Sequence, residues 1–387
     1  MDLQKTGAKY DAAEATAMYE YRREKLYRWM NEEGLSLLMF QHTEGQTDPA
    51  VRWLTGYPAD ALLFLVSEKK SMLVPWDIHL ALSCSCADEV TPYTDFERQP
   101  INAIRGAIRS FGLPLGAKLE IPPVTPYPQF LQYVESLSEC DIVCRTGGAH
   151  EEVGRLRAIK DDAEIALYRQ VSGFTNELMD LLEKQIREGK LKTESETALF
   201  IEAEGRKRGC EGTGFETLAA GPARSFGIHP FPAYTLGEFA GPGLSILDFG
   251  LVYKGYTSDV TLTFAREPLT KAQEKLITLV ERAYRMALDL VRTGGPTKDI
   301  AFEVDAFFRH AKKAMPHALG HGIGLEAHEF PALRNRSDND WILQPGMVFT
   351  LEPGLYDPRQ GGCRLENDIL LTESGPETLT NARIIRL

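Results

Sequence analysis

The sequence predicts an α/β N-terminal domain followed by a larger α+β domain, and three observations support this prediction. The chain has 387 residues, more than one hydrophobic core usually organises. Short apolar runs alternate with helical patterns over the first ~150 residues, as in layered α/β units. After Gly147 and Gly148 the pattern changes to long helices separated by glycine-rich strands. We therefore expect two domains, covering residues 1–150 and 151–387.

The first domain alternates helices with short strands, and none of its strands is followed by the glycine fingerprint of a dinucleotide-binding unit. The expected helices cover residues 20–33, 101–111 and 129–137, and the expected strands cover 35–40, 51–57 (VRWLTGY, ending at a glycine turn), 61–67, 71–76, 117–122 and 141–146.

The second domain repeats one order of elements, two helices followed by a β-hairpin. The expected helices cover residues 151–188, 194–209, 271–292 and 300–314. Glycine- and proline-rich strands extend to residue 265, and strands return over the last ~75 residues. This order suggests an internal duplication, although no residue-level repeat accompanies it.

Composition restricts the class of protein. Apolar residues make up 43% and charged residues 25%, which is typical of soluble globular proteins. The 43 basic against 55 acidic residues give a net charge of −12, so we expect neither nucleic acid nor a membrane surface as a partner. The N-terminal stretch lacks the apolar core of a secretory signal. Six cysteines in so long a chain indicate no disulfide scaffold, and we expect a cytoplasmic location.

Two predicted hairpins each carry a pair of acidic residues. Asp248 and Asp259 lie symmetrically about a turn near residues 253–255. In a simple register they would face each other with Cβ atoms ~5 Å apart, whereas a bulge at Gly255 would shift the pairing. Carboxylates that close repel unless one is protonated or a cation lies between them. Two solvent-exposed hairpin aspartates are the ordinary alternative.

Glu352 and Glu366 are likewise symmetric about a turn over residues 358–362. Both are in apolar surroundings, where an uncompensated glutamate is costly. Arg364 could neutralise one of these glutamates, but it could not neutralise four carboxylates.

Three histidines lie between the hairpins, in HALGHGIGLEAHEFP. His317 and His321 are four residues apart, as in helical metal sites, but Gly320, Gly322 and Gly324 favour a tight loop or irregular strand. His328 completes the group, and His229 in RSFGIHPFP is a fourth candidate.

These motifs resemble the five-ligand signature of the creatinase/aminopeptidase "pita-bread" family, the M24 metallopeptidases. Residue types, order and context all match, and VRWLTGY and LRAIKDDAEIALYRQ resemble the family's N-terminal domain and its link to the catalytic domain. The resemblance implies a pita-bread catalytic domain. It also implies two divalent metal ions, Mn²⁺ first, with Co²⁺, Fe²⁺ or Zn²⁺ as alternatives. The implied metal ligands are Asp248, Asp259, His321, Glu352 and Glu366, with Asp259 and Glu366 bridging both ions.

The resemblance also implies roles for other residues. Glu352 would move a proton, His229 and His328 would hydrogen-bond the substrate, and His317 would shape the pocket. Arg364 and Thr350 would orient the ligands. The expected partners are a peptide with proline at its second position and, as in the family, a second copy of the chain.

Two departures from the family pattern affect the predicted reaction. Ala332 occupies the place where prolidases often carry an arginine for a dipeptide's carboxylate, and the nearest arginines are Arg334 and Arg336. Asn367 stands where an aspartate is usual, which removes no ligand. We therefore expect an Xaa-Pro aminopeptidase, with Xaa-Pro dipeptidase (prolidase) as the alternative. A metal-using hydrolase or lyase of a small molecule stays open, and a binding module without catalysis is disfavoured because all five ligands are present.

Overall fold

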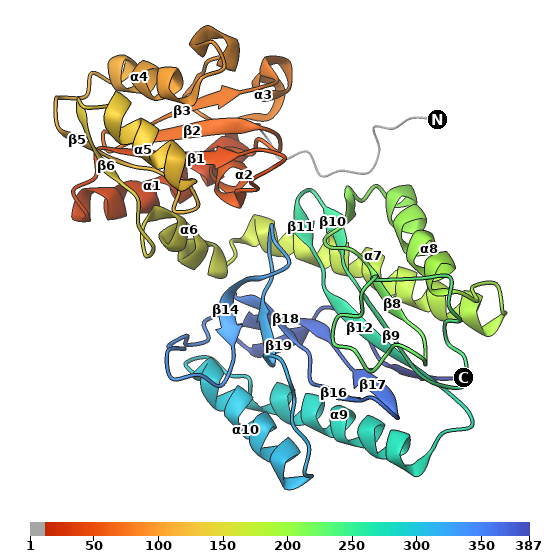
Figure 1. The fold of residues 1–387 in the computed structure, drawn as a ribbon. Helices are drawn as coiled ribbons and strands as arrows, with labels where there is room; N and C mark the ends of the chain where they lie inside the picture. The colour runs from red at the N-terminus through yellow and green to blue at the C-terminus, as the bar shows by residue number, and fades with distance from the viewer. Residues whose placement is uncertain (1–11) are drawn as a thin grey trace. The chain divides into compact units, whose positions relative to one another are not determined.

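Figure 1 shows the fold in a computed structural model, which describes residues 12–387, with side chains from residue 16 onward. The chain forms two compact units, one ending at Leu156 and the other running from Arg157 to Leu387. The N-terminal stretch in which no secretory signal is expected falls mostly within residues 1–11, outside the described residues.

The first unit is a six-stranded mixed sheet with the order β4-β3-β2-β1-β5-β6. Strands β1 to β3 pair antiparallel, and the outer pairs are parallel. The elements are α1 (Ala12–Glu32), β1 (Leu37–His42), α2 (Pro49–Thr55), β2 (Ala61–Val66), β3 (Lys70–Pro75), α3 (Ile78–Cys84), β4 (Glu89–Val90), the 3-10 helix η1 (Tyr93–Phe96), α4 (Pro100–Ser110), β5 (Ala117–Glu120), α5 (Tyr127–Ser136) and β6 (Cys140–Val143).

The strand predicted at residues 51–57 is wrong, because this segment is the helix α2. Asp48 caps the helix by accepting a hydrogen bond from the Ala50 N–H at 2.9 Å, and Pro49 occupies its first turn. Gly56 ends the helix in the left-handed region at φ 81°. Capping at both ends therefore outweighs the β-propensity of the residues between them.

The second unit contains four long helices and several small sheets. Figure 1 shows α7 and α8 on one side of the strands and α9 and α10 on the other. The elements are α6 (Ala149–Ala158, which spans the division between the units), α7 (Asp162–Arg187), α8 (Glu194–Lys207), β7 (Gly212–Thr213), β8 (Leu218–Ala220), β9 (Gly243–Phe249), β10 (Leu251–Tyr253), β11 (Tyr256–Thr257), β12 (Val260–Arg266), α9 (Lys271–Leu290), α10 (Thr297–His310), β13 (Gly320–Gly322), β14 (Glu329–Leu333), β15 (Val348–Leu351), β16 (Gly354–Asp357), β17 (Gly361–Arg364), β18 (Asn367–Thr372), β19 (Gly375–Thr378) and β20 (Ile384–Arg386).

The sheets of the second unit repeat the predicted order of a helix pair followed by a hairpin. The hairpin of β9 and β12 belongs to the sheet β20-β12-β9-β8, and β15 and β18 belong to the sheet β14-β13-β15-β18-β19. Capping boxes fix the starts of α7, α8 and α9, each with a side chain that accepts from the third helical residue. The apolar faces of these helices and sheets share one buried core.

Two further findings concern the described chain. All six cysteines are free thiols. Within residues 12–387, none of the helices has both the length and the apolar character needed to cross a bilayer.

Candidate metal centre

The first acidic hairpin has a different register from the one expected. Asp248 on β9 pairs with Thr261 on β12, so the prediction that it faces Asp259 is wrong by two residues. Gly250 allows this shift, because a Cβ at that position would overlap the carbonyl oxygen of Ser258. Since side chains alternate with a period of two, the shift leaves Asp248 and Asp259 on the same side of the hairpin.

The second acidic hairpin has the expected register. Leu351 pairs with Asn367 in the sheet, and Gly354 pairs with Arg364 in the ribbon of β16 and β17. Counting inward from either pair places Glu352 opposite Glu366. The two glutamates lie where the hairpin passes from the sheet into the ribbon, and Glu366 instead bridges to Thr261 of the first hairpin. The two acidic hairpins therefore meet side by side.

His321 lies at the centre of β13, the irregular strand that the glycines predict. Its Nδ1 is 3.2 Å from the Gly322 carbonyl oxygen, which only accepts, so Nδ1 carries the proton. Nε2 then presents a lone pair to Asp259 Oδ2 and to Glu352 Oε1, each 3.7 Å away. Burial lowers the pKa of His321 to about 3, which keeps the ring neutral. Three potential ligand atoms thus converge at one point.

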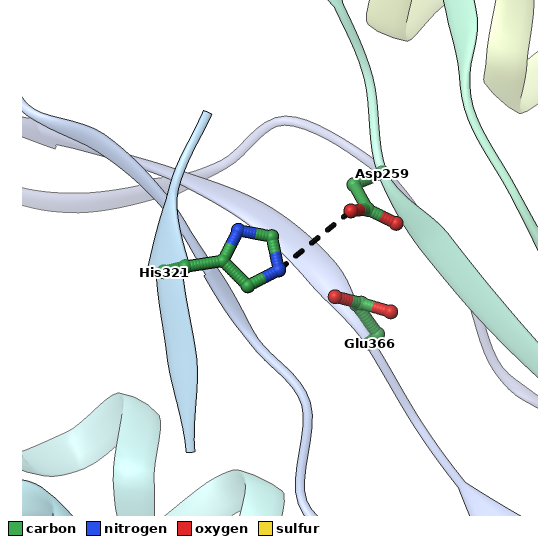
Figure 2. Close-up of side chains that lie close together, drawn as sticks. All are labelled: Asp259, His321 and Glu366. Atoms are coloured by element: carbon green, nitrogen blue, oxygen red, sulfur yellow. Dashed lines mark ion pairs between the residues drawn. The ribbon is translucent and has the colours of Figure 1, made fainter. Parts of the chain in front are cut away.

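Figure 2 shows Asp259, His321 and Glu366 converging from three different segments. One ligand atom from each lies within 4.8 Å of the other two, which is close enough for a single cation to bind all three. The pKa values of the carboxylates reflect their burial close to one another. Burial, together with the neighbouring carboxylates, raises the pKa of Asp259 and of Glu352 well above their usual values. Burial and the charge of Asp248 raise the pKa of Glu366 to about 7.

Asp248 contacts a cation of the chain itself. Its Oδ2 pairs with the Arg364 guanidinium, whereas its buried Oδ1 has no hydrogen-bond partner. Arg364 is 1% exposed, and its Nε donates to Thr261 Oγ1 at 2.9 Å. Arg364 therefore forms its ion pair with Asp248, although its charge also partly offsets the burial that raises the pKa of both glutamates, and it leaves one oxygen of Asp248 free for a metal ion.

Two threonines support the acidic residues. Thr261 Oγ1 donates to Glu366 Oε2 at 2.7 Å, and Thr350 Oγ1 accepts from the His321 N–H at 3.3 Å. Thr350 was among the predicted site residues, but Thr261 was missed. Its signal was the period of two in DVTLTF, which places Thr261 on the same face as Asp259.

Tyr356 is a second site residue that sequence reasoning missed, and its hydroxyl links Arg364 to His317. Its hydroxyl accepts from Arg364 Nη1 at 2.8 Å and lies 3.0 Å from His317 Nε2. His317 Nδ1 is 2.8 Å from the Ala318 carbonyl oxygen, so both ring nitrogens of His317 are engaged. Burial lowers the pKa of His317 to about 4. This environment suits a histidine that shapes the pocket.

One cavity of about 480 Å³ is lined by all five predicted metal ligands, Asp248, Asp259, His321, Glu352 and Glu366. His229 and His328 also line it, and the His321 and His328 rings lie 4.2 Å apart between centroids. Ala332 and Arg334 form part of the wall, and Arg334 is the one basic side chain among the lining residues. A cavity of this size accommodates a short peptide.

Comparison with known proteins agrees with this geometry. Residues 166–373 match the model of metallopeptidase family M24, and residues 22–159 match the creatinase/prolidase N-terminal domain. The sequence is 30% identical to an Xaa-Pro dipeptidase of Pyrococcus furiosus, over 64% of this chain and 70% of that protein. It is also 30% identical to the uncharacterized peptidase YqhT of Bacillus subtilis, over 86% of this chain and 91% of that protein. The crystal structure of an X-Pro aminopeptidase from Thermotoga maritima superposes with a TM-score of 0.80 at 26% identity, covering 94% of this chain and 99% of that one.

Proposed function

Because this chain belongs to metallopeptidase family M24, we propose that it is an Xaa-Pro aminopeptidase, which releases the residue before a proline at position 2 of a peptide. The observation that carries the proposal is the convergence of Asp259, His321 and Glu366 within 4.8 Å in a cavity of peptide size. The M24 peptidases depend on metal, and the named relatives include both an aminopeptidase and a dipeptidase specific for proline.

The residues present fit two divalent ions. The free Oδ1 of Asp248, the neutral His321 and the raised carboxylate pKa values all indicate a site that lacks positive charge. Asp248, Asp259, His321, Glu352 and Glu366 would hold these ions. Four oxygen ligands and one imidazole favour Mn²⁺, with Co²⁺, Fe²⁺ or Zn²⁺ as alternatives. Such a pair of ions activates water and polarises the scissile carbonyl.

The chain's own residues would position the substrate and move protons. His229 and His328 line the cavity and would hydrogen-bond the substrate on either side of the scissile bond. Glu352, which also lines the cavity, would move a proton during the reaction. Arg364, Thr350 and the Tyr356–His317 pair would keep these groups in place.

Substrate length separates the aminopeptidase from its alternative. Ala332 leaves the wall small at the place where a dipeptidase arginine is often found, which favours a peptide that continues beyond proline. Arg334, however, also lines the cavity, and its closest acidic partner, Asp338, is 4.0 Å away and already bound by Arg336 at 3.0 Å. This available guanidinium favours an Xaa-Pro dipeptidase as the second candidate.

Comparing kcat/KM for Ala-Pro and Ala-Pro-Ala with Mn²⁺-loaded protein tests the two candidates. We expect the tripeptide to be preferred, and Arg334→Ala to leave the preference unchanged. A strong preference for Ala-Pro that falls about 10–100-fold in Arg334→Ala would identify the dipeptidase instead. Arg336→Ala is the matched control, since Arg336 does not line the cavity.

A homodimer and a cytoplasmic location stay proposals, which rest on the family and on the composition. Light scattering at micromolar concentration tests the first, and a monomer at all concentrations would contradict it.

A further inference from the structure

His229 is carried by a segment without helix or strand, residues 221–237 between β8 and β9, which we call the His229 loop. Its apolar side chains hold it only in part, because Tyr234 packs against the buried core whereas Phe231 is 95% and Leu236 is 85% exposed. A loop of this length would ordinarily move, yet a histidine that binds substrate needs a fixed position. Polar contacts must therefore supply much of the order.

Glu194, the first residue of α8, supplies most of these contacts. It is 1% exposed, and its carboxylate accepts hydrogen bonds from three residues of the His229 loop. Gly221 N donates to Oε1 at 2.8 Å, and Thr235 donates to Oε2 through its backbone N at 2.8 Å and its hydroxyl at 2.6 Å. Arg224 Nη1 pairs with Oε2 as well. One carboxylate thus joins the beginning and the end of the loop.

The start of α8 extends this attachment through its backbone. The Glu194 N–H donates to the Gly237 carbonyl oxygen at 3.0 Å, and the Ser195 N–H donates to that of Thr235 at 2.9 Å. These first-turn N–H groups have no partner within a helix, so the loop satisfies them. Arg224 also donates to the Pro232 carbonyl oxygen, which draws the middle of the loop toward the same point.

The other side of the loop is attached to the candidate metal centre. Arg364 Nη1 donates to the Ile228 carbonyl oxygen at 3.2 Å, directly before His229, and Ser225 Oγ donates to the Leu244 carbonyl oxygen at 2.7 Å. These two contacts attach the loop to Arg364 and to the start of β9. Glu194 binds the two ends of the loop and Arg364 binds its middle, so the segment that carries His229 is attached on both sides.

We propose that Glu194 is a positioning residue, which orders the His229 loop and so fixes His229 for the substrate. The inference rests on the proposed function for the role of His229, but Glu194 itself touches neither the cavity nor the metal ligands among the described contacts. Its negative charge is essential to this role, because donors face both of its oxygens. In a glutamine, the amide NH₂ would confront a donor in either orientation.

The first test compares Glu194→Gln with Glu202→Gln, a control on the exposed face of the same helix. We expect Glu194→Gln to lower kcat/KM for Ala-Pro-Ala on the order of 100-fold, as for a displaced substrate-binding group. Its metal content should stay at the wild-type level. Glu202→Gln should behave as wild type.

A double-mutant cycle separates positioning from general damage. In a His229→Ala background, Glu194→Gln should cost less than about two-fold more in kcat/KM, because the group that it positions is gone. An equal loss in both backgrounds, or loss of bound metal, would overturn the proposal. If Glu194→Gln does not fold, Thr235→Val removes one donor to Glu194 together with the acceptor of the Gly237 N–H, and it should show a smaller loss with the same dependence on His229.

A spectroscopic readout keeps this inference independent of the substrate proposal. The ring resonances of His229, assigned by their absence in His229→Ala, should shift or broaden in Glu194→Gln, and amide exchange should accelerate over residues 221–237. Wild-type protein without Xaa-Pro activity would contradict the proposed function and leave this readout intact. Unchanged resonances and exchange would contradict the role of Glu194.

Discussion

Glu329 and Glu366 are buried acidic residues of the same unit, and their surroundings differ in one respect. The side chain of Glu329 is 4% exposed and lies against Arg157, with Lys160 Nζ 3.5 Å away. Burial alone would raise the pKa of Glu329, but the two cations outweigh it and the net shift is downward. Glu366 is 2% exposed, and burial and Asp248 raise its pKa to about 7.

The difference shows how a chain distinguishes a structural carboxylate from a ligand. Arg157 and Lys160 neutralise Glu329 directly after His328, and this ion cluster fixes the start of β14 at the edge of the cavity. The acidic hairpins receive one arginine for four carboxylates. A buried group of negative charges with too few partners requires protons or a bound cation.

The largest effect should follow from removing a carboxylate of the acidic hairpins. We expect Asp259→Ala and Glu366→Ala each to lose metal and activity by more than the roughly 10–100-fold that loss of a supporting partner costs. Metal analysis after desalting, with kcat/KM for Ala-Pro-Ala, measures this. Glu373→Ala, an exposed residue just after β18, is the control. Full activity in either ligand variant would refute the ligand assignment.

Removing the carboxylate of Glu329 should destabilise the fold. Glu329→Ala leaves Arg157 and Lys160 buried without their shared partner, and breaking such a pair costs on the order of 3–5 kcal/mol. Denaturant unfolding of metal-free protein measures it. The comparison becomes sharper with Glu366→Gln, which removes repulsion and should not lower the stability of the metal-free protein. Equal destabilisation by both changes would mean that the two clusters do not differ as described.

The contribution of Glu366 to the stability of the metal-free protein should fall as pH rises, in opposition to His317 and His321, whose lowered pKa values add stability as pH rises toward 6.5. Glu366 binds its proton more tightly in the folded than in the unfolded state, so the folded state holds more protons between the unfolded value of 4.5 and about 7. Since one pKa unit is worth about 1.4 kcal/mol, Glu366 alone accounts for a loss on the order of 3 kcal/mol across that window. Bound Mn²⁺ should abolish the decline. Unfolding curves of metal-free wild type and Glu366→Gln at pH 5 and 7.5 test this, and an identical pH dependence in both proteins would contradict it.

Much of the centre was predictable because it is built from local patterns. The symmetry of Glu352 and Glu366 about one turn gave their true register, and the glycines around His321 excluded a helix. The segment around Trp53 was mispredicted because Asp48, Pro49 and Gly56, which define a helix, were not weighed against its β-forming residues. The predicted pairing of Asp248 with Asp259 was wrong because the residues between them form β10 and β11, which belong to a separate sheet.

Contacts between distant segments were out of reach. Glu194 lies 27 to 41 positions from the loop residues that it binds, and Arg157 lies 172 positions from Glu329. No periodicity connects such residues. A glutamate at the start of a helix is also common without any such contact, because its negative charge stabilises the helix N-terminus. Only the folded arrangement shows that Glu194 serves two segments.

The constant register of the second acidic hairpin restricts where its length can vary during evolution. The β15–β18 pairs and the β16–β17 pairs follow one continuous count, interrupted only around Glu352 and Glu366. An insertion at the tip, over residues 358–360, would lengthen the turn and leave both glutamates opposite each other. A single residue added between Leu351 and Gly354 would instead move the side chains of one strand to the opposite face. One glutamate would then point away from the cavity. Natural relatives should therefore tolerate gaps at the tip and exclude them beside the two glutamates.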